Sequence, residues 1–202
     1  MVEIMIATKN LDKIREIRNI INFPNLIFKT FLDYKDIPDV VEDEPTIEGN
    51  SQKKALVIAK HTGLYSLADD SGLFVSALGD RPGVYSARYA GDNATYMDNN
   101  IKLLKELEGK RYEERKAVFR CAMTIASSDG KFITEVGEIN GYITETIRGS
   151  NGFGYDPLFY VPEQNKTFAE ILPETKNKIS HRAKAIFKIK PHIERIVNNG
   201  FL

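Results

Sequence analysis

The segment 8–13, Thr-Lys-Asn-Leu-Asp-Lys, lies between a short apolar run and a helical pattern, so a strand-to-helix junction is predicted there. A helix N-terminus offers unpaired backbone N–H groups and the positive end of a dipole, which suits a phosphate. Thr8 and Asn10 could add hydrogen bonds, and Lys13 could reach back from the first turn. The glycine-rich Walker spacing is absent. The alternative is an ordinary Asn10 cap followed by a solvated lysine.

Two acidic segments could hold a hard cation. Asp69 and Asp70 follow an apolar run, and the predicted loop 33–48 is rich in carboxylates, among them Glu42. Carboxylates that lie close together repel one another unless a cation neutralises them, and oxygen ligands select magnesium or calcium. Magnesium typically takes one or two protein carboxylates and completes its shell with water and phosphate. The alternative is a turn at 69–72 surrounded by solvated acids.

A third segment, 149–157, combines glycines with aromatic residues. Glycines let the backbone approach a ligand, and Phe153 and Tyr155 could stack on a base. Such stacking contributes about 1–3 kcal/mol per base. The alternative is a turn whose aromatic side chains fill the core.

The fourth segment, 176–182, is basic. An arginine beside a histidine, Arg182 and His181, suits phosphate or a keto oxygen. We expect neighbouring apolar residues to occupy the buried stripe and leave both side chains free to point elsewhere. The alternative is a solvated basic helix start. The histidines have no zinc-ligand spacing.

The elements that must position these segments follow from hydrophobic periodicity. Strands are predicted at 2–7 and 64–68, and a hairpin around the Ser-Asp-Gly sequence 128–130. Turn formers fill 79–92, and Pro191 is predicted to end or kink the C-terminal helix. This order of elements favours an α/β fold with a mixed sheet over a doubly wound parallel sheet. The predicted buried helical stripes are Ile14, Ile17 and Ile20 or Ile21; Ala55, Ile58 and Ala59; Met97, Ile101, Leu104 and Leu107; and Ile179, Ala183, Ile186 and Phe187.

Bulk composition narrows the function classes. The 202 residues include 28 basic and 28 acidic side chains, so no net field draws the chain to nucleic acid or to a membrane surface. The single cysteine, Cys121, excludes an internal disulfide and is expected to be a buried, inert thiol. No stretch approaches the ~20 apolar residues of a membrane span. We expect a cytoplasmic enzyme with no nucleic-acid or membrane partner.

Together these segments resemble the inosine triphosphate pyrophosphatase family, which removes non-standard purine nucleotides. The match runs nearly end to end. It rests on TKNLDK (8–13), VVEDEPTIEGNSQKKA (40–55), LADDSGL (67–73), RPGVYSARYAG (81–91), FGYDPLF (153–159) and SHR (180–182). The resemblance implies an elongated mixed sheet flanked by helices, in two lobes with a central substrate cleft. It also implies a single family domain over 1–202, a homodimer, and cleavage of ITP, dITP or XTP into monophosphate and pyrophosphate.

The resemblance also implies roles for individual positions. Magnesium would be bound by Glu42 and Asp70, and Asp70 would also accept the proton of the attacking water. The residues implied to bind substrate are Thr8, Lys9, Asn10, Leu11, Asp12, Lys13, Lys54, Ser71, Phe153, Gly154, Tyr155, Asp156, Lys176, His181 and Arg182.

Two expectations concern the chemistry. A free aspartate titrates near 3.9, so Asp70 is expected to be a weak base. A buried donor aimed at purine position 6 pairs with a keto oxygen and is left unsatisfied by an amino group. The candidate donors are Arg182 and the backbone N–H groups of 153–156.

The sequence departs from the family pattern in two places. Lys9 stands where many relatives have glycine, and the acidic loop carries Glu44, Pro45 and Gly49 in place of the usual residues. Three other functions are weighed: a Maf-like nucleotide pyrophosphatase with another base preference, a nucleotide-binding regulator without catalysis, and a nucleic-acid-binding module. The zero net charge weighs against the last.

Overall fold

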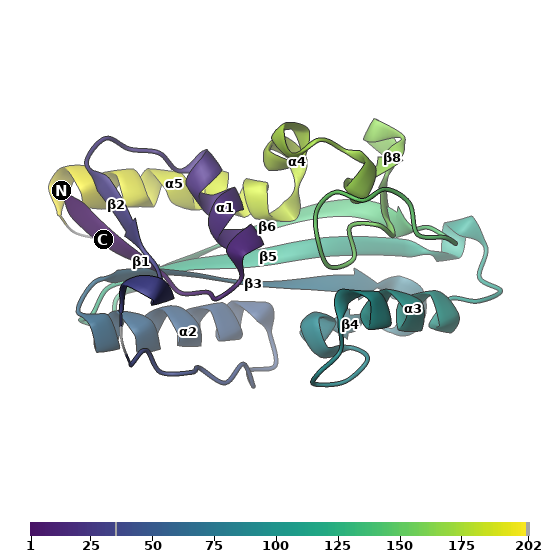
Figure 1. The fold of residues 1–202 in the computed structure, drawn as a ribbon, viewed down its shortest axis with the longest axis horizontal. Helices are drawn as coiled ribbons and strands as arrows, with labels where there is room; N and C mark the ends of the chain where they lie inside the picture. Colours follow the sequence, from purple (N-terminus) through teal and green to yellow (C-terminus); the bar gives the residue numbers. More distant parts are fainter. Residues whose placement is uncertain (35, 201–202) are drawn as a thin grey trace. The chain divides into compact units, whose positions relative to one another are not determined.

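The computed structural model describes residues 1–34 and 36–200, which form one mixed sheet with helices on both faces (Figure 1). The sheet order is β2-β1-β3-β5-β6-β7-β8, and β4 pairs with β3. β1 is parallel to β2 and β3, whereas β3–β4, β6–β7 and β7–β8 are antiparallel. The predicted α/β class with a mixed sheet is confirmed. The strands are β1 Val2–Ile6, β2 Leu26–Lys29, β3 Tyr65–Val75, β4 Arg81–Gly83, β5 Lys116–Ala126, β6 Phe132–Ile143, β7 Phe159–Val161 and β8 Lys166–Thr167, and the α-helices are α1 Leu11–Ile20, α2 Ile47–Thr62, α3 Tyr96–Glu106, α4 Pro173–Ile179 and α5 His181–Asn199.

The chain divides into two compact units. Unit 1 comprises Met1–Asp70, Cys121–Gly137 and Arg182–Leu202, and unit 2 comprises Ser71–Arg120 and Glu138–His181. The boundary falls within β3, β5 and β6 and between α4 and α5. In the described part of the chain, no helix is both long enough and apolar enough to span a membrane.

In unit 1, α1 and α5 lie on one face of the sheet and α2 lies on the other (Figure 1). Alternate strand residues pack against these two layers. Ile4 and Ile6 of β1 pack with α1 and α5, while Met5 packs with α2 on the opposite face. β3 repeats the alternation, with Leu67 on the first face and Ala68 on the second. Side chains of a strand point alternately to the two faces of the sheet. The next two residues of β3, Asp69 and Asp70, must therefore point to opposite faces.

Local sequence signals set the helix ends in unit 1. Asn10 caps α1, and its side chain accepts hydrogen bonds from the amides of Asp12 and Lys13. Thr46 caps α2 by accepting from the amide of Gly49. Gly63 ends α2 at φ 71°, a left-handed conformation that glycine adopts without strain. Both helix starts therefore lie close to the segments that carry the candidate chemistry.

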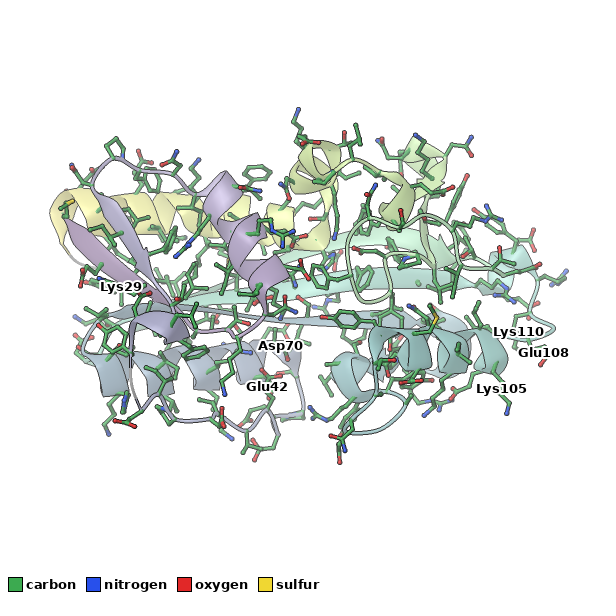
Figure 2. All side chains as sticks on the ribbon, viewed as in Figure 1. Lys29, Glu42, Asp70, Lys105, Glu108 and Lys110 are labelled. Carbon is green, nitrogen blue, oxygen red and sulfur yellow. The ribbon has the colours of Figure 1, made fainter. Side chains whose placement is uncertain are left out.

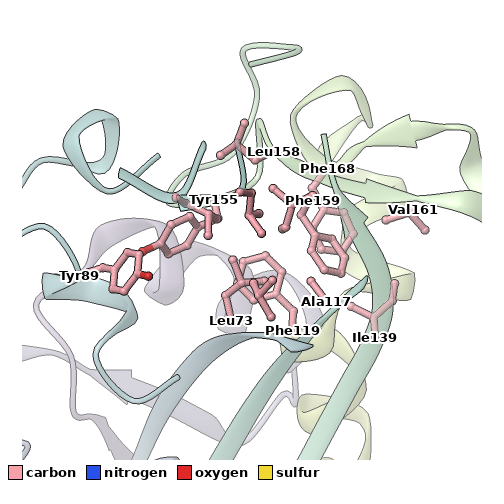
Figure 3. Close-up of a cluster of buried hydrophobic side chains, with 14 of the residues drawn as sticks. Leu73, Tyr89, Ala117, Phe119, Ile139, Tyr155, Leu158, Phe159, Val161 and Phe168 are labelled. Carbon is pink, nitrogen blue, oxygen red and sulfur yellow. The ribbon is translucent and has the colours of Figure 1, made fainter. Parts of the chain in front are cut away.

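The core of unit 2 is rich in aromatic residues (Figure 3). Phe119 of β5 lies 4.8 Å, centroid to centroid, from Phe159 of β7, and Phe159 lies 5.2 Å from Phe168. Leu103 and Leu107, from α3 and its C-terminal cap, complete this core with Leu73 of β3 and other apolar residues. This core supports the glycine-rich loop that carries Phe153.

Several predictions about elements are wrong. The predicted inner stripe of α3 included Met97 and Ile101, but these are exposed, because Asn99 and Asn100 occupy the buried face and bond to backbone groups. Pro191 does not end the C-terminal helix: it lies inside α5, and Ile189 and Ile193 are buried on either side of it.

The third error concerns the C-terminal stripe. The segment is two helices that meet at Ser180, so Ile179 packs in the core of unit 2 while Ala185, Ile186, Ile189, Ile193 and Ile196 pack in unit 1. Phe187 of the predicted stripe is exposed. The irregular structure predicted for the turn formers of 79–92 is also wrong in part, because Arg81–Gly83 forms β4, which pairs with β3.

Candidate active site

The β1–α1 loop of unit 1 lines a cavity of about 210 Å³. Thr8 and Lys9 contribute to its wall together with Glu42 of the acidic loop and Lys54 of α2; the other lining residues are Ala7, Phe31, Pro38, Asp39 and Val40. The structure thus brings together three segments that the sequence singled out separately. Both lining lysines are paired with lining carboxylates, Lys9 with Asp39 and Lys54 with Glu42. A cavity lined by cations and carboxylates beside a helix N-terminus suits a phosphate chain that carries a divalent cation.

The capping role considered for Asn10 is present, since its side chain is engaged with the first turn of α1. The same alternative also expected Lys13 to be solvated, and this is not what the structure shows. Lys13 is largely buried and its Nζ lies 3.0 Å from Asp69 Oδ2. Leu11 and Asp12 do not line the cavity: Leu11 is exposed, and Asp12 pairs with Arg15.

The acidic loop is attached to α2 through two side chains of the same helix face. Lys54 Nζ donates to Glu42 Oε1. Asn50, one turn earlier, donates from Nδ2 to Asp70 Oδ2 at 3.0 Å and accepts from the amide of Glu44 at 2.9 Å. Residues four apart on a helix are neighbours on its surface. The helix therefore binds both Glu42 and Asp70, whose labelled side chains lie near one another beside α2 (Figure 2).

Asp70 lies in an environment that favours its protonated form. Burial and the nearby carboxylate of Glu42 raise the pKa of Asp70 to about 6, although Lys13, Lys54 and the Asn50 amide act in the opposite direction. Without a bound cation, Asp70 is therefore a stronger base than a free aspartate, whose pKa lies near 3.9. Two crowded carboxylates, one of them buried, form a hard-oxygen set that a divalent cation would stabilise.

The donor set fits magnesium better than zinc. Over residues 1–34 and 36–200, no group of three or more His, Cys, Asp or Glu side chains could hold a metal ion. Glu42 and Asp70 provide two oxygen ligands, which is the number that magnesium commonly takes from a protein. They are the residues that could hold it.

Asp69 lies on the opposite face of β3 from Asp70 and anchors two cations. Lys13 Nζ and Arg182 Nη2 lie 3.0 Å and 3.1 Å from Asp69 Oδ2, and Arg182 Nη1 donates to Glu16 at 2.7 Å. Burial alone would raise the pKa of Asp69, but the charges of Lys13, Arg182 and Lys54 hold it well below its ordinary value. The buried cluster fixes the start of α1 against the start of α5.

In unit 2, the glycine-rich loop is organised around Asp156. Its Oδ2 accepts from the amide of Phe153 at 2.9 Å and pairs with Lys176 Nζ at 2.6 Å. The same ammonium group lies 4.8 Å from the centroid of the Phe153 ring. Asn100 of α3 donates to the carbonyl of Gly154 at 3.0 Å. These contacts present the Phe153 ring and the loop backbone in one defined arrangement.

We expect Gly152→Ala to disrupt this arrangement. Gly152 has φ 75°, and a Cβ there would lie 2.0 Å from Asp156 Oδ2, so the carboxylate must leave Lys176. Gly109 is a matched control in the same unit, with φ 74° and open space around its missing Cβ. Alanine at 109 is expected to cost about 1 kcal/mol, and alanine at 152 at least ~2 kcal/mol more, measured by denaturant unfolding. Equal costs would contradict the role of Asp156.

Two predicted positions are buried by core packing. The Tyr155 side chain lies in the aromatic core of unit 2 and donates to the carbonyl of Ser86 at 2.9 Å, so its ring cannot face a base. His181 stacks on Phe119, with centroids 4.5 Å apart. The expectation that His181 and Arg182 point away from the packed interior is wrong, since both are about 97% buried or more. Ser71, half-buried, follows Asp70 along β3.

Sequence reasoning missed three residues of these arrangements. Asn50 lies in a predicted helix and has no motif of its own. A buried asparagine needs hydrogen-bond partners for both the oxygen and the nitrogen of its amide. Glu16 lies on α1 without a local motif, and its partner Arg182 is 166 residues away. Tyr96 of α3 lies 6.1 Å from the Phe153 ring, and only its position next to a helix cap could have drawn attention.

Comparison with known proteins supplies an independent assignment. The Ham1 family model matches residues 4–192. The dITP/XTP pyrophosphatase of Geobacter sulfurreducens is 49% identical over 193 residues, which cover 96% of this chain and 97% of that protein. That of Geobacillus kaustophilus is 47% identical over 197 residues, 98% and 97% of the two chains.

Solved structures agree with the sequence relatives. A HAM1 protein from Coxiella burnetii superimposes with a TM-score of 0.88 at 38% identity, covering 96% of this chain and 99% of that one. The Staphylococcus aureus Ham1 protein gives 0.86 at 39% identity, with 95% and 98% covered. The predicted resemblance is thereby confirmed over nearly the whole length, and this chain belongs to the Ham1 family.

Proposed function

We propose that this chain hydrolyses non-standard purine nucleoside triphosphates, namely ITP, dITP and XTP, to the monophosphate and pyrophosphate. The observation that carries the proposal is the cavity of unit 1. It joins Thr8 and Lys9 with Glu42 and Lys54, and α2 connects its acidic side to Asp70. The names of the relatives support the substrate class, since they are dITP/XTP pyrophosphatases.

The triphosphate binds at the β1–α1 loop in this proposal. Lys9 and Lys54 supply positive charge at the cavity wall, and Lys13 contributes from the first turn of α1. Positioning and electrostatic stabilisation provide most of the barrier reduction in phosphoryl transfer. Residues that hold the phosphate chain rigidly therefore act on the rate directly.

Asp70 is the proposed proton acceptor. Water attacks the α-phosphorus, its proton passes to a carboxylate oxygen of Asp70, and the bond from the α-phosphorus to the bridging oxygen breaks to release pyrophosphate. Magnesium held by Glu42 and Asp70 would supply Lewis acidity and neutralise phosphate charge. Asn50 and Lys54 keep the two carboxylates oriented toward the reacting groups.

Base recognition is assigned to the Phe153 loop of unit 2. Arg182, one candidate donor for a 6-keto oxygen, is engaged with Asp69 and Glu16 through all three of its nitrogens. Within the described residues, the amides of Gly154 and Tyr155 have no hydrogen-bond partner. The backbone alternative is therefore favoured. Lys176 and His181 fix the surrounding structure through Asp156 and Phe119.

Phe153→Leu is expected to weaken substrate binding. The substitution retains apolar volume but removes the ring face, which would contribute about 1–3 kcal/mol by stacking on the base. The KM for ITP should rise about 5–150-fold, with a smaller change in kcat. Phe187→Leu removes a ring that is exposed on α5, and serves as the control. An unchanged KM would contradict base stacking at Phe153.

The proposal is tested with a panel of ITP, XTP, dITP, ATP, GTP and pyrimidine triphosphates. Both products are identified, with magnesium and with chelator. Pyrophosphate release from ITP and XTP, dependent on magnesium and at least ~10²-fold faster than from ATP, is expected. Preference for pyrimidines would indicate a Maf-like activity. Tight binding without turnover would indicate a nucleotide-binding regulator.

Two further properties belong to the same proposal. We expect a cytoplasmic homodimer acting on the free nucleotide pool, with no nucleic-acid partner. Exposed apolar side chains of α3, Met97 and Ile101, lie four residues apart on one face and support contact with a second copy. Light scattering should give twice the mass of the 202-residue chain. A monomeric mass at micromolar concentration would contradict this assembly.

A further inference from the structure

Asn50 connects two acidic segments that are far apart in the chain. Its Nδ2 donates to Asp70 Oδ2 at 3.0 Å, and its Oδ1 accepts from the backbone amide of Glu44 at 2.9 Å. The residue is 1% exposed, so neither bond can be replaced by bulk water. An unsatisfied buried amide costs free energy, so both partners are held firmly in place.

The acidic loop lies directly against the helix at the preceding residue. A Cβ on Gly49 would come within 2.9 Å of Glu44 Cβ and 3.2 Å of Thr46 Oγ1. Gly49 has no φ in the left-handed range, so its role is close approach and not backbone conformation. The unusual residues Glu44 and Gly49 thus fit one another: glycine in the helix makes room for the glutamate in the loop.

Lys54 completes the attachment one turn later. It binds the Glu42 carboxylate, so α2 contacts the loop at Glu42 through a side chain and at Glu44 through the backbone. Asp70 is bound by the same helix face through Asn50. A shift of the loop relative to α2 would therefore separate Glu42 from Asp70.

We propose that Asn50 is a positioning residue that couples the acidic loop to Asp70, setting Glu42 and Asp70 at the spacing required to share one divalent cation. The inference rests on the proposed function and deepens it. The amide oxygen of Asn50 binds the backbone of the loop, and its amide nitrogen binds one oxygen of Asp70. Because that bond fixes the carboxylate, the orientation of the other Asp70 oxygen is fixed as well. Substrate contacts of the β1–α1 loop do not depend on it.

The test uses Asn50→Ala in the full-length protein. Mn²⁺ is titrated into nucleotide-free protein and free ion is measured by electron paramagnetic resonance, while kcat and KM for ITP are measured separately in magnesium. Loss of an orienting partner typically costs 10–100-fold in metal affinity or activity, and we expect a loss of that order in Mn²⁺ affinity and kcat. The KM for ITP at saturating magnesium should change less than about threefold.

Ser51→Ala is the matched control. Ser51 is buried on the same helix and bonds to the carbonyl of Ala68 and the hydroxyl of Thr124, but it contacts neither Asp70 nor the acidic loop. Its loss should lower stability and leave Mn²⁺ affinity and kcat within about twofold of the wild type. An Asn50→Ala protein that behaves like Ser51→Ala in both readouts would overturn the coupling role.

Gly49→Ala decides the question if Asn50→Ala does not fold. The added methyl group must displace Glu44 while Asn50 and Asp70 stay unchanged, so Mn²⁺ affinity should fall at least ~3-fold. Unchanged affinity would overturn the inference. A wild-type protein that binds no Mn²⁺ and releases no pyrophosphate would overturn the proposed function and this inference with it. If the wild type binds Mn²⁺ and releases pyrophosphate, and Asn50→Ala and Gly49→Ala do so equally well, only the inference would be overturned.

Discussion

Asp70→Asn is expected to lower turnover of ITP at least ~100-fold, the lower range for loss of a general base. Asparagine cannot accept the proton of the attacking water, and it weakens the cation site shared with Glu42. The bond from Asn50 Nδ2 can persist, because an asparagine oxygen replaces the carboxylate oxygen that accepts it. The loss therefore reports the chemistry and not the local fold. Retention of more than about a tenth of the wild-type turnover would contradict the role.

The same substitution should stabilise the metal-free protein at neutral pH. The pKa of Asp70 is raised from 3.8 to about 6, so the folded state favours its protonated form. The wild type therefore loses stability as pH rises from about 4 through 6 and loses no more above that range. Asparagine avoids this cost, and we expect a gain of about 1–3 kcal/mol above pH 7 in chelator.

Asp43→Asn provides the control for both readouts. Asp43 lies in the same acidic loop, is exposed, and pairs with Lys53. Solvent screens an exposed ion pair, so stability and turnover should change little. Urea unfolding at pH 5 and pH 8 in chelator measures the stabilities. If Asp70→Asn were less stable than the wild type at pH 8, ionised Asp70 would not destabilise the folded protein, which would contradict the prediction.

Asp69→Asn is expected to cause the largest loss of stability. Asp69 is buried against Lys13 and Arg182, and removing its charge leaves two buried cations with less compensation. Removing one partner of a buried ion pair costs about 3–5 kcal/mol. The melting temperature should fall by roughly 6–20 °C. Scanning calorimetry measures the shift.

The pH dependence of Asp69 is opposite to that of Asp70. Its pKa is held below the ordinary value, so its stabilising effect is complete above about pH 4 and is lost as pH falls through the folded-state pKa. The difference between wild type and Asp69→Asn should therefore shrink in acid. Asp12→Asn, which removes the partner of the exposed Arg15, is the control and should change stability by less than about 1 kcal/mol. Equal stability of Asp69→Asn and Asp12→Asn would contradict the buried cluster.

The sequence predicted the elements whose signals are local. The apolar run of β1, the cap at Asn10 and the hairpin at 128–130 each depend on a few neighbouring residues, and the structure confirms them. The end of β3 could not be predicted in this way. Gly72 suggested a turn, yet the strand continues to Val75, where it pairs with β4. Glycine at 72 instead allows close approach, because the carbonyl of Gly83 on β4 passes 2.6 Å from where a Cβ would lie.

Features that depend on residues far apart in the chain could not be predicted from the sequence. Strand alternation places Asp69 toward the α1 and α5 cations and Asp70 toward Asn50, and none of these partners is a neighbour in the sequence. The predicted stripe of α3 left out Asn99 and Asn100, although both are buried and donate hydrogen bonds to backbone carbonyls. The buried face of a helix therefore differs from the apolar stripe that periodicity predicts where polar side chains bind backbone groups elsewhere in the fold.

The most direct measurement is hydrolysis of ITP in water enriched in ¹⁸O. Attack on the α-phosphorus, with Asp70 accepting the proton, must place the label in inosine monophosphate and leave pyrophosphate unlabelled. We predict that outcome in magnesium and no turnover in chelator. Label in pyrophosphate, or release of orthophosphate as the first product, would contradict the account.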